Sequence, residues 1–231
     1  MTIKEYKDYV DVTFSYLEKE NILPGDVNYD IIYRVYNNAN DFTIYFNAKT
    51  NKDTLVNLTN HTYFNLSGNG KRTILDHKLK LNCDRYTNLN NELITTSIDK
   101  VNKVMSFMKP HKIKKYINDD SLQNHTAKGY DHCYLKEDEF VEEIAILKDR
   151  KSKRSLTIKT SYPSIVVYTT NYPASFDFSL RAALANAVFF PSGVINIKIL
   201  SIPGAIPPCG GHPYLNAVNI DLNLSSTSSL V

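Results

Sequence analysis

Short runs in which apolar and polar residues alternate recur along this chain, and they constrain its fold more than any other feature. In Val10–Tyr16, Val, Val, Phe and Tyr alternate with Asp, Thr and Ser. A period of two places the apolar side chains on one face of a β-strand. Comparable strand-like runs follow at 31–35, 42–48, 75–83, 144–147, 156–160 and 165–170.

Turn-forming residues separate these runs, as in Pro24-Gly25-Asp26, in 37–41 and in Ser67-Gly68-Asn69-Gly70. Many strands joined by short turns, with no sustained helical period, predict an all-β, antiparallel β-sandwich. The segment 101–124 is polar and rich in lysine, with weak periodicity. We interpret it as a long surface excursion, with a helical turn as the only regular structure expected there.

Composition and charge favour an ordinary globular protein and argue against a nucleic-acid partner. The chain is 42% hydrophobic and 22% charged, with a formal net charge of +3. Its only dense basic run, 148–154, lies between two strand-like runs, so we interpret it as a solvated hairpin turn.

Cysteine spacing and hydropathy indicate no metal site, no disulfide framework and no membrane partner. Cys83, Cys133 and Cys209 are odd in number and widely separated. The first residues form no apolar signal region, and no stretch reaches transmembrane length. We therefore expect a cytoplasmic protein.

The character of the chain changes after about Phe178. Asp221 is the only acidic residue from Ser179 onward, and the region 202–211 is rich in Pro and Gly. We therefore divide the chain into a β-sandwich region, 1–178, and a divergent C-terminal segment, 179–231. The composition leaves open whether this segment belongs to the same domain or is loosely attached.

Four motifs in the first of these regions carry a resemblance to a known family. Val56–Leu66, which reads VNLTNHTYFNL, closely resembles the signature of the aldose 1-epimerases, or galactose mutarotases. Ile74–His77 with Cys83–Thr87, Gly129–His132 and Val167–Tyr172 resemble further family segments, in family order. The resemblance implies a sandwich of the galactose mutarotase-like (supersandwich) type, incomplete because the chain starts inside the family's fold.

The resemblance also implies an activity, the interconversion of the α and β anomers of a hexose such as galactose or glucose. One group removes the proton of the anomeric hydroxyl while another protonates the ring oxygen, so no cofactor is needed. Histidine suits the acid, since its ordinary pKa is about 6.5. By resemblance His61, which we expect at a strand end, is the general acid, and Asp131 accepts hydrogen bonds from sugar hydroxyls. The alternatives are a structural histidine and a simple turn aspartate. His77 shares a face with leucines, which indicates core packing or a hydrogen-bonded structural role.

Two departures from the family pattern predict weak activity. The family's Leu-His-Gly-Gly sequence is absent, and no histidine precedes His61. The family's general base, a glutamate in Leu-Glu-x-Gln, aligns with Asn186 when Phe190-Pro191 is the anchor. Asparagine cannot accept a proton at neutral pH, so we expect little anomer interconversion. A non-catalytic carbohydrate-binding or sensor module and an inactive gene remnant are the alternatives. The sequence leaves the sugar and the oligomeric state open.

Overall fold

The computed structural model shows a nearly all-β molecule in which every strand pairing is antiparallel. The structure describes residues 1–68, 71–136, 143–169, 171, 183–185 and 194–200, the last two ranges for their backbone alone. The predicted fold class, an antiparallel β-sandwich, is confirmed within this part of the chain.

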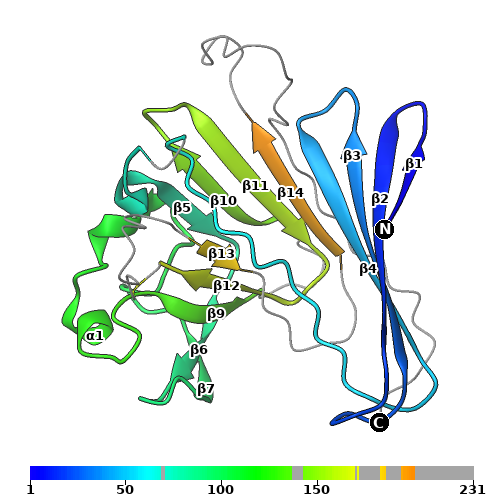
Figure 1. Ribbon diagram of the computed structural model, residues 1–231. Coiled ribbons are helices and arrows are strands. Elements are labelled where there is room, and N and C mark those ends of the chain that lie inside the picture. Colours follow the sequence, from blue (N-terminus) through cyan, green and yellow to red (C-terminus); the bar gives the residue numbers. More distant parts are fainter. Residues whose placement is uncertain (69–70, 137–142, 170, 172–182, 186–193, 201–231) are drawn as a thin grey trace.

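Two sheets form the molecule (Figure 1). Within the described residues the larger has nine strands in the order β1-β2-β3-β4-β14-β11-β10-β5-β8, and the smaller has five in the order β13-β12-β9-β6-β7. The strands of the larger sheet are β1 (Thr2–Glu5), β2 (Tyr9–Glu18), β3 (Val27–Tyr36), β4 (Asp41–Thr50), β5 (Lys78–Leu81), β8 (His111–Lys112), β10 (Glu143–Asp149), β11 (Arg154–Thr160) and β14 (Val194–Leu200). Those of the smaller sheet are β6 (Arg85–Leu89), β7 (Thr95–Lys100), β9 (Asp131–Leu135), β12 (Ser164–Tyr168) and β13 (Ala183–Ala185).

The alternating runs become strands with the expected faces. The register places Val12 opposite Tyr33, and Tyr33 opposite Ile44, so the apolar set of β2, β3 and β4 shares one face. The run 75–83 yields a shorter strand than predicted. Its first part is a 3₁₀ turn, η1 (Ile74–Asp76), because the Thr73 side chain accepts a hydrogen bond from the backbone N–H of Leu75.

The hydrophobic core lies between the two sheets. Leu79, Leu147 and Leu156 contribute from the larger sheet and are buried. Tyr134 and Ile165 contribute from the smaller sheet and are completely buried. Because side chains alternate along a strand, the neighbours of these residues point away from the core, where ligands and solvent can reach them.

The prediction that 101–124 is a surface excursion is wrong. Its apolar side chains enter the core, although they follow no helix or strand period: Met105, Phe107, Ile113, Ile117 and Leu122. The segment holds β8, a second 3₁₀ turn, η2 (Ile113–Lys115), and a single helical turn, α1 (Asp120–Gln123). Side-chain caps supply part of its order, since Asn102 accepts from the N–H groups of Val104 and Met105. Irregular caps of this kind give no periodic signal in a sequence.

After residue 178 the chain still contributes a strand to each of the two sheets. β13 pairs with β12, and β14 lies between β4 and β11. Among the described residues, no helix has both the length and the apolar character needed to cross a membrane.

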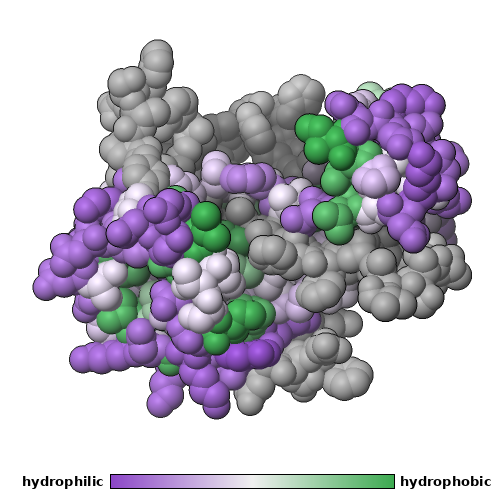
Figure 2. All heavy atoms as spheres, turned by 90° about the horizontal axis from the view of Figure 1, so that it is seen from below, coloured by the Kyte–Doolittle hydropathy of each residue, from purple (hydrophilic) through white to green (hydrophobic). Residues whose placement is uncertain are grey.

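The far end of the larger sheet leaves apolar side chains uncovered. Phe14 and Tyr16 of β2 are 46% and 66% exposed, whereas Ile44 of β4 is fully buried. Figure 2 shows apolar surface beside polar surface at the right of the view, in the part of the molecule that holds β1–β4. Burial therefore increases from the edge strands toward β4.

We expect Phe107→Ala to lower the free energy of unfolding by about 3–5 kcal/mol, because it leaves a cavity in the core. The neighbouring Met108, which is 47% exposed, provides the control, and Met108→Ala should change the value by less than about 0.5 kcal/mol. Urea unfolding of the two variants measures both effects. Equal, small losses would contradict the placement of 101–124 in the core.

Candidate functional site

The segment that holds His61 is irregular chain. The structure describes no strand between β4 and β5, so the expectation that His61 lies at a strand end is wrong. None of the described residues between Thr50 and η1 belongs to a strand. The backbone N–H and C=O groups of this segment need other partners, because unpaired buried polar groups are costly.

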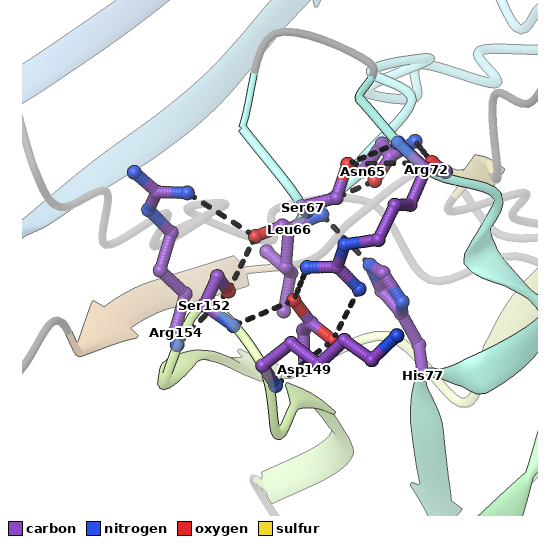
Figure 3. A network of polar contacts seen from close by, with 9 residues as sticks. Asn65, Leu66, Ser67, Arg72, His77, Asp149, Ser152 and Arg154 are labelled. Atoms are coloured by element: carbon purple, nitrogen blue, oxygen red, sulfur yellow. Dashed lines mark hydrogen bonds and ion pairs between the residues drawn. The ribbon is translucent and has the colours of Figure 1, made fainter.

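Side chains from the larger sheet and the loops around it supply those partners, and Leu66 receives most of them (Figure 3). The Leu66 N–H donates to Nε2 of His77 at 2.9 Å. The Leu66 carbonyl accepts from Oγ of Ser152 at 2.6 Å and from Nη1 of Arg154 at 3.3 Å. Farther along the segment, the Leu58 carbonyl accepts from the hydroxyl of Tyr162 at 3.1 Å. The motif is therefore held in place without strand pairing.

An ion pair with a buried carboxylate links the turn that follows the motif to the β10–β11 hairpin (Figure 3). The Arg72 guanidinium donates to the Asp149 carboxylate at 2.7 and 3.3 Å, and the Asp149 side chain is 1% exposed. Burial acts to raise the pKa of Asp149, but the hydrogen bonds from Arg72 and Ser152 prevail and hold it well below its usual range. Asn65 joins the same network, since its side-chain amide donates to the Arg72 carbonyl at 2.8 Å.

The residues of the basic run 148–154 therefore have two different roles. The run forms the predicted hairpin between β10 and β11. Its Ser152 and Arg154 bind the motif rather than solvent, while Arg150, Lys151 and Lys153 are exposed. The interpretation as a wholly solvated turn is wrong, because the contacts to Leu66 span more than 80 residues of sequence.

His77 is a structural residue, in agreement with its expected packing role. The ring is completely buried and accepts from Leu66 through Nε2. Burial lowers the pKa of His77, and the nearby Asp149 carboxylate opposes this shift only in part. The ring is thus held neutral in the form that can accept the Leu66 hydrogen bond.

Two tyrosine rings, those of Tyr63 and Tyr168, connect His61 to the smaller sheet. The imidazole of His61, which is exposed, lies edge-on to the ring of Tyr63 at a centroid distance of 5.1 Å. Tyr63 is 43% exposed, and its ring lies 6.1 Å from that of Tyr168. Tyr168 ends strand β12. The motif segment therefore covers the end of this strand.

Asp131 lies on the same face as Tyr168. It begins strand β9, and the register places it directly opposite Tyr168 on β12. Burial raises the pKa of Asp131, and the nearby His125 opposes this in part. Burial also raises the pKa of Tyr63, with added contributions from Tyr168 and from the Asp131 carboxylate. Because Tyr63 lies beside Tyr168 and Tyr168 pairs with Asp131, the structure brings the motif segment close to the strand that carries Asp131.

Thr169 and Asn171 fix the turn before Asp131. The Tyr130 N–H donates to Oγ1 of Thr169 at 3.1 Å, and the Tyr130 carbonyl accepts from Nδ2 of Asn171 at 2.9 Å. Gly129 packs so closely here that an added Cβ would collide with the Asn171 side chain. Only glycine fits this position, which explains why the motif reads Gly-Tyr-Asp-His.

His132, the next residue, points to the opposite face of β9 and is 6% exposed. Burial, aided by the nearby His125, lowers the pKa of His132 to about 4. Its Nδ1 accepts from the Asp131 N–H at 3.1 Å. His132 therefore supports the backbone of Asp131 and does not reach the face on which Asp131 lies.

Sequence reasoning named His61 and Asp131 but missed the side chains between and around them. Tyr63 and Tyr168 belong to two of the family motifs, but nothing in the sequence indicates that their rings lie side by side. For Ser152 and Arg154, the sequence shows only that they lie in a basic run, and it does not predict that they bind the motif. Asn186, the residue at the expected position of the general base, lies outside the described residues.

Comparison with known proteins shows the class of protein that this fold and site define. A family model described as aldose 1-epimerase matches residues 2–198. The chain is 32% identical over 173 residues to an aldose 1-epimerase of Haemophilus influenzae, which covers 73% of this chain and 49% of that protein. It is 30% identical over 152 residues to the galactose mutarotase of Rattus norvegicus, which covers 64% of this chain and 42% of that protein. The chain belongs to the aldose 1-epimerase family, and it spans half or less of the length of these relatives.

Solved structures show the same fold. A galactose 1-epimerase from Lactobacillus acidophilus matches with a TM-score of 0.72 at 21% identity, over 86% of this chain and 65% of that one. A homologue of the galactose mutarotases and aldose epimerases from Caenorhabditis elegans matches with a TM-score of 0.69 at 21% identity, over 87% of this chain and 68% of that one. The galactose mutarotase-like type of sandwich, predicted from the motifs, is confirmed.

The lowered pKa of His132 predicts how stability depends on pH. Between about pH 6.5 and pH 4 the unfolded chain binds a proton at this residue that the folded chain excludes. The free energy of unfolding should therefore be greatest above pH 6.5 and fall by up to roughly 3 kcal/mol on the way to pH 4. His132→Asn, whose amide oxygen can still accept from Asp131, should flatten this slope in urea unfolding at pH 7 and pH 5. If the free energy of unfolding of His132→Asn depended on pH as strongly as that of the unaltered chain, the lowered pKa of His132 would be contradicted.

Proposed function

We propose that this chain carries the hexose-binding and acid part of an aldose 1-epimerase site. The observation that carries the proposal is a chain of contacts: His61 packs against Tyr63, Tyr63 lies beside Tyr168, and Tyr168 pairs with Asp131. These residues come from three segments that are far apart in the sequence, at 61–63, 131 and 168. Each of the segments carries one of the family motifs.

His61 acts as the proton donor to the ring oxygen of the sugar. Its imidazole is exposed, so a ligand can reach it. The Tyr63 ring limits its movement from one side. The anchoring of Leu66 to His77, Ser152 and Arg154 fixes the chain five residues away. A general acid needs such positioning, because proton transfer requires hydrogen-bond distance to the reacting oxygen.

Asp131 holds the sugar through hydroxyl groups. An ionised carboxylate accepts hydrogen bonds only, and a sugar offers adjacent hydroxyl donors. The half-buried setting excludes part of the competing water, so each hydrogen bond to the carboxylate is stronger than it would be in free solution. The rings of Tyr63 and Tyr168 provide an apolar wall beside it, against which the C–H face of a hexose can pack.

The activity of the chain itself is low in this proposal. Ring opening needs a base for the anomeric hydroxyl as well as an acid for the ring oxygen. The residue aligned with the family's glutamate is Asn186, whose amide cannot take up a proton. In this proposal the chain therefore retains sugar binding but has lost most of its catalytic activity. Such a protein would take part in hexose metabolism.

A thermal-shift series with galactose and with glucose tests the binding part. We expect sugar to raise the melting temperature, because it binds the folded state alone. Asp131→Asn should weaken binding about tenfold or more, as one charged hydrogen-bond acceptor is lost. Asp8→Asn, at an exposed carboxylate outside the site, is the matched control and should bind as the unaltered chain does. Equal stabilisation of the Asp131 variant would place the sugar elsewhere.

Polarimetry with freshly dissolved α-sugar tests the catalytic part. We expect the chain to accelerate the reaction little over buffer, and Asn186→Glu to increase the rate by roughly 10²-fold or more, since it restores a base. Asn186→Gln, which adds length without a carboxylate, is the control. His61→Ala should remove the gained activity.

Robust turnover by the unaltered chain, abolished by His61→Ala, would overturn the proposal of low activity. Sugar-dependent stabilisation without turnover in Asn186→Glu would instead favour the binding or sensor module.

A further inference from the structure

A row of lysines crosses the outer face of the larger sheet, on the side opposite the core. Lys112 of β8 lies directly opposite Lys78 of β5, and Lys78 lies directly opposite Lys148 of β10. Side chains in such positions share a face, with Cβ atoms about 4.5–5.5 Å apart. Like charges placed this way destabilise a sheet, so the arrangement has a cost in the free protein.

The β10–β11 hairpin and the start of η2 extend this row. Lys148 continues into Arg150, Lys151 and Lys153, all exposed. We name the whole set the basic stripe, which consists of Lys78, Lys80, Lys112, Lys114, Lys148, Arg150, Lys151 and Lys153. Its members come from three separate parts of the sequence, so the sequence showed only one dense run.

The acidic residues beside the stripe do not neutralise it. Asp76 binds Lys112 at 2.7 Å and Lys114 at 2.9 Å. Asp149 is turned inward, where it pairs with Arg72. Within the described residues, the ion pairs of the stripe are therefore those of Lys112 and Lys114 with Asp76. The stripe concentrates positive charge in a chain whose formal net charge is only +3.

Protection of a sheet edge explains part of the stripe. Lysines on edge strands discourage pairing with other chains, and β8 is an edge strand with β5 beside it. Lys148 lies on the third strand from that edge, and the hairpin cations lie beyond the end of this strand. These residues need another explanation.

The chemistry of the stripe fits a surface of diffuse negative charge. It holds seven lysines and one arginine. Bidentate recognition of single phosphates favours arginine, and single-stranded nucleic acids require aromatic platforms, which this set of residues lacks. Point charges on flexible stems, on one sheet face and on the adjoining hairpin and 3₁₀ turn, suit the headgroup layer of an anionic bilayer.

We propose that the basic stripe docks this protein peripherally on an anionic lipid bilayer. The proposal departs from the expectation, drawn from the sequence alone, that no membrane is a partner. It is independent of the sugar site, since none of its residues belongs to that site.

Co-sedimentation of the full chain with vesicles tests the proposal. We expect binding to vesicles of 70% phosphatidylcholine and 30% phosphatidylserine, and none to pure phosphatidylcholine. Raising the salt from about 0.1 M to about 1 M should release the protein, because the Debye length falls from about 10 Å to about 3 Å. The combined variant Lys78→Gln, Lys148→Gln and Lys151→Gln should weaken binding about 100-fold, at about 1 kcal/mol per lysine.

A variant with the same net charge separates local from total charge. Lys4→Gln, Lys49→Gln and Lys100→Gln remove three exposed lysines outside the stripe and should leave most of the binding intact. An equal loss in this control would overturn the proposal, as would equal binding to neutral vesicles. Tighter binding to a single-stranded DNA oligonucleotide than to the anionic vesicles, at equal salt, would assign the stripe to nucleic acid instead.

Discussion

The attachment of Leu66 to the larger sheet is the constraint on which the rest of the site depends. Its N–H and C=O groups are bound by His77, Ser152 and Arg154, and none of these contacts belongs to a strand ladder. The Arg72–Asp149 ion pair holds the adjoining turn and hairpin together. Since the Asp149 carboxylate is buried, loss of Arg72 would leave its charge without compensation, and this anchor resists displacement. It lets an irregular segment carry His61 at a fixed place.

The smaller sheet supplies the other half of the site through strand pairing. The register of β9 against β12 sets Asp131 opposite Tyr168, and the clamp of Thr169 and Asn171 on Tyr130 fixes the approach to β9. One face of β9 thus carries the Asp131 carboxylate, while His132 and Tyr134 on the other face pack inward. The two halves meet through the Tyr63 and Tyr168 rings. The positions of the site residues are therefore set by strand pairing and by hydrogen bonds from neighbouring residues.

Several features could be predicted from the sequence, and others could not, for definite reasons. Strands β2, β3 and β4 followed from alternation, because a single buried face leaves a period-two pattern. The burial of Phe107 and Leu122 left no such pattern, because caps and short turns direct these side chains inward. The dual role of the 148–154 hairpin was also hidden. Charge alone does not reveal that Arg154 bonds to a carbonyl far away in the sequence.

The sequence by itself determined the fold class and the family, and it led to the proposal of His61 and Asp131 as site residues, because these depend on local patterns and on short motifs. It also determined that asparagine occupies position 186. Tertiary structure alone decided that His61 is carried on irregular chain, that Tyr63 reaches Tyr168, and that lysines from β5, β8 and β10 form one row. The physical reason is register: which side chains become neighbours depends on how strands distant in the sequence pair, and no local pattern encodes that pairing.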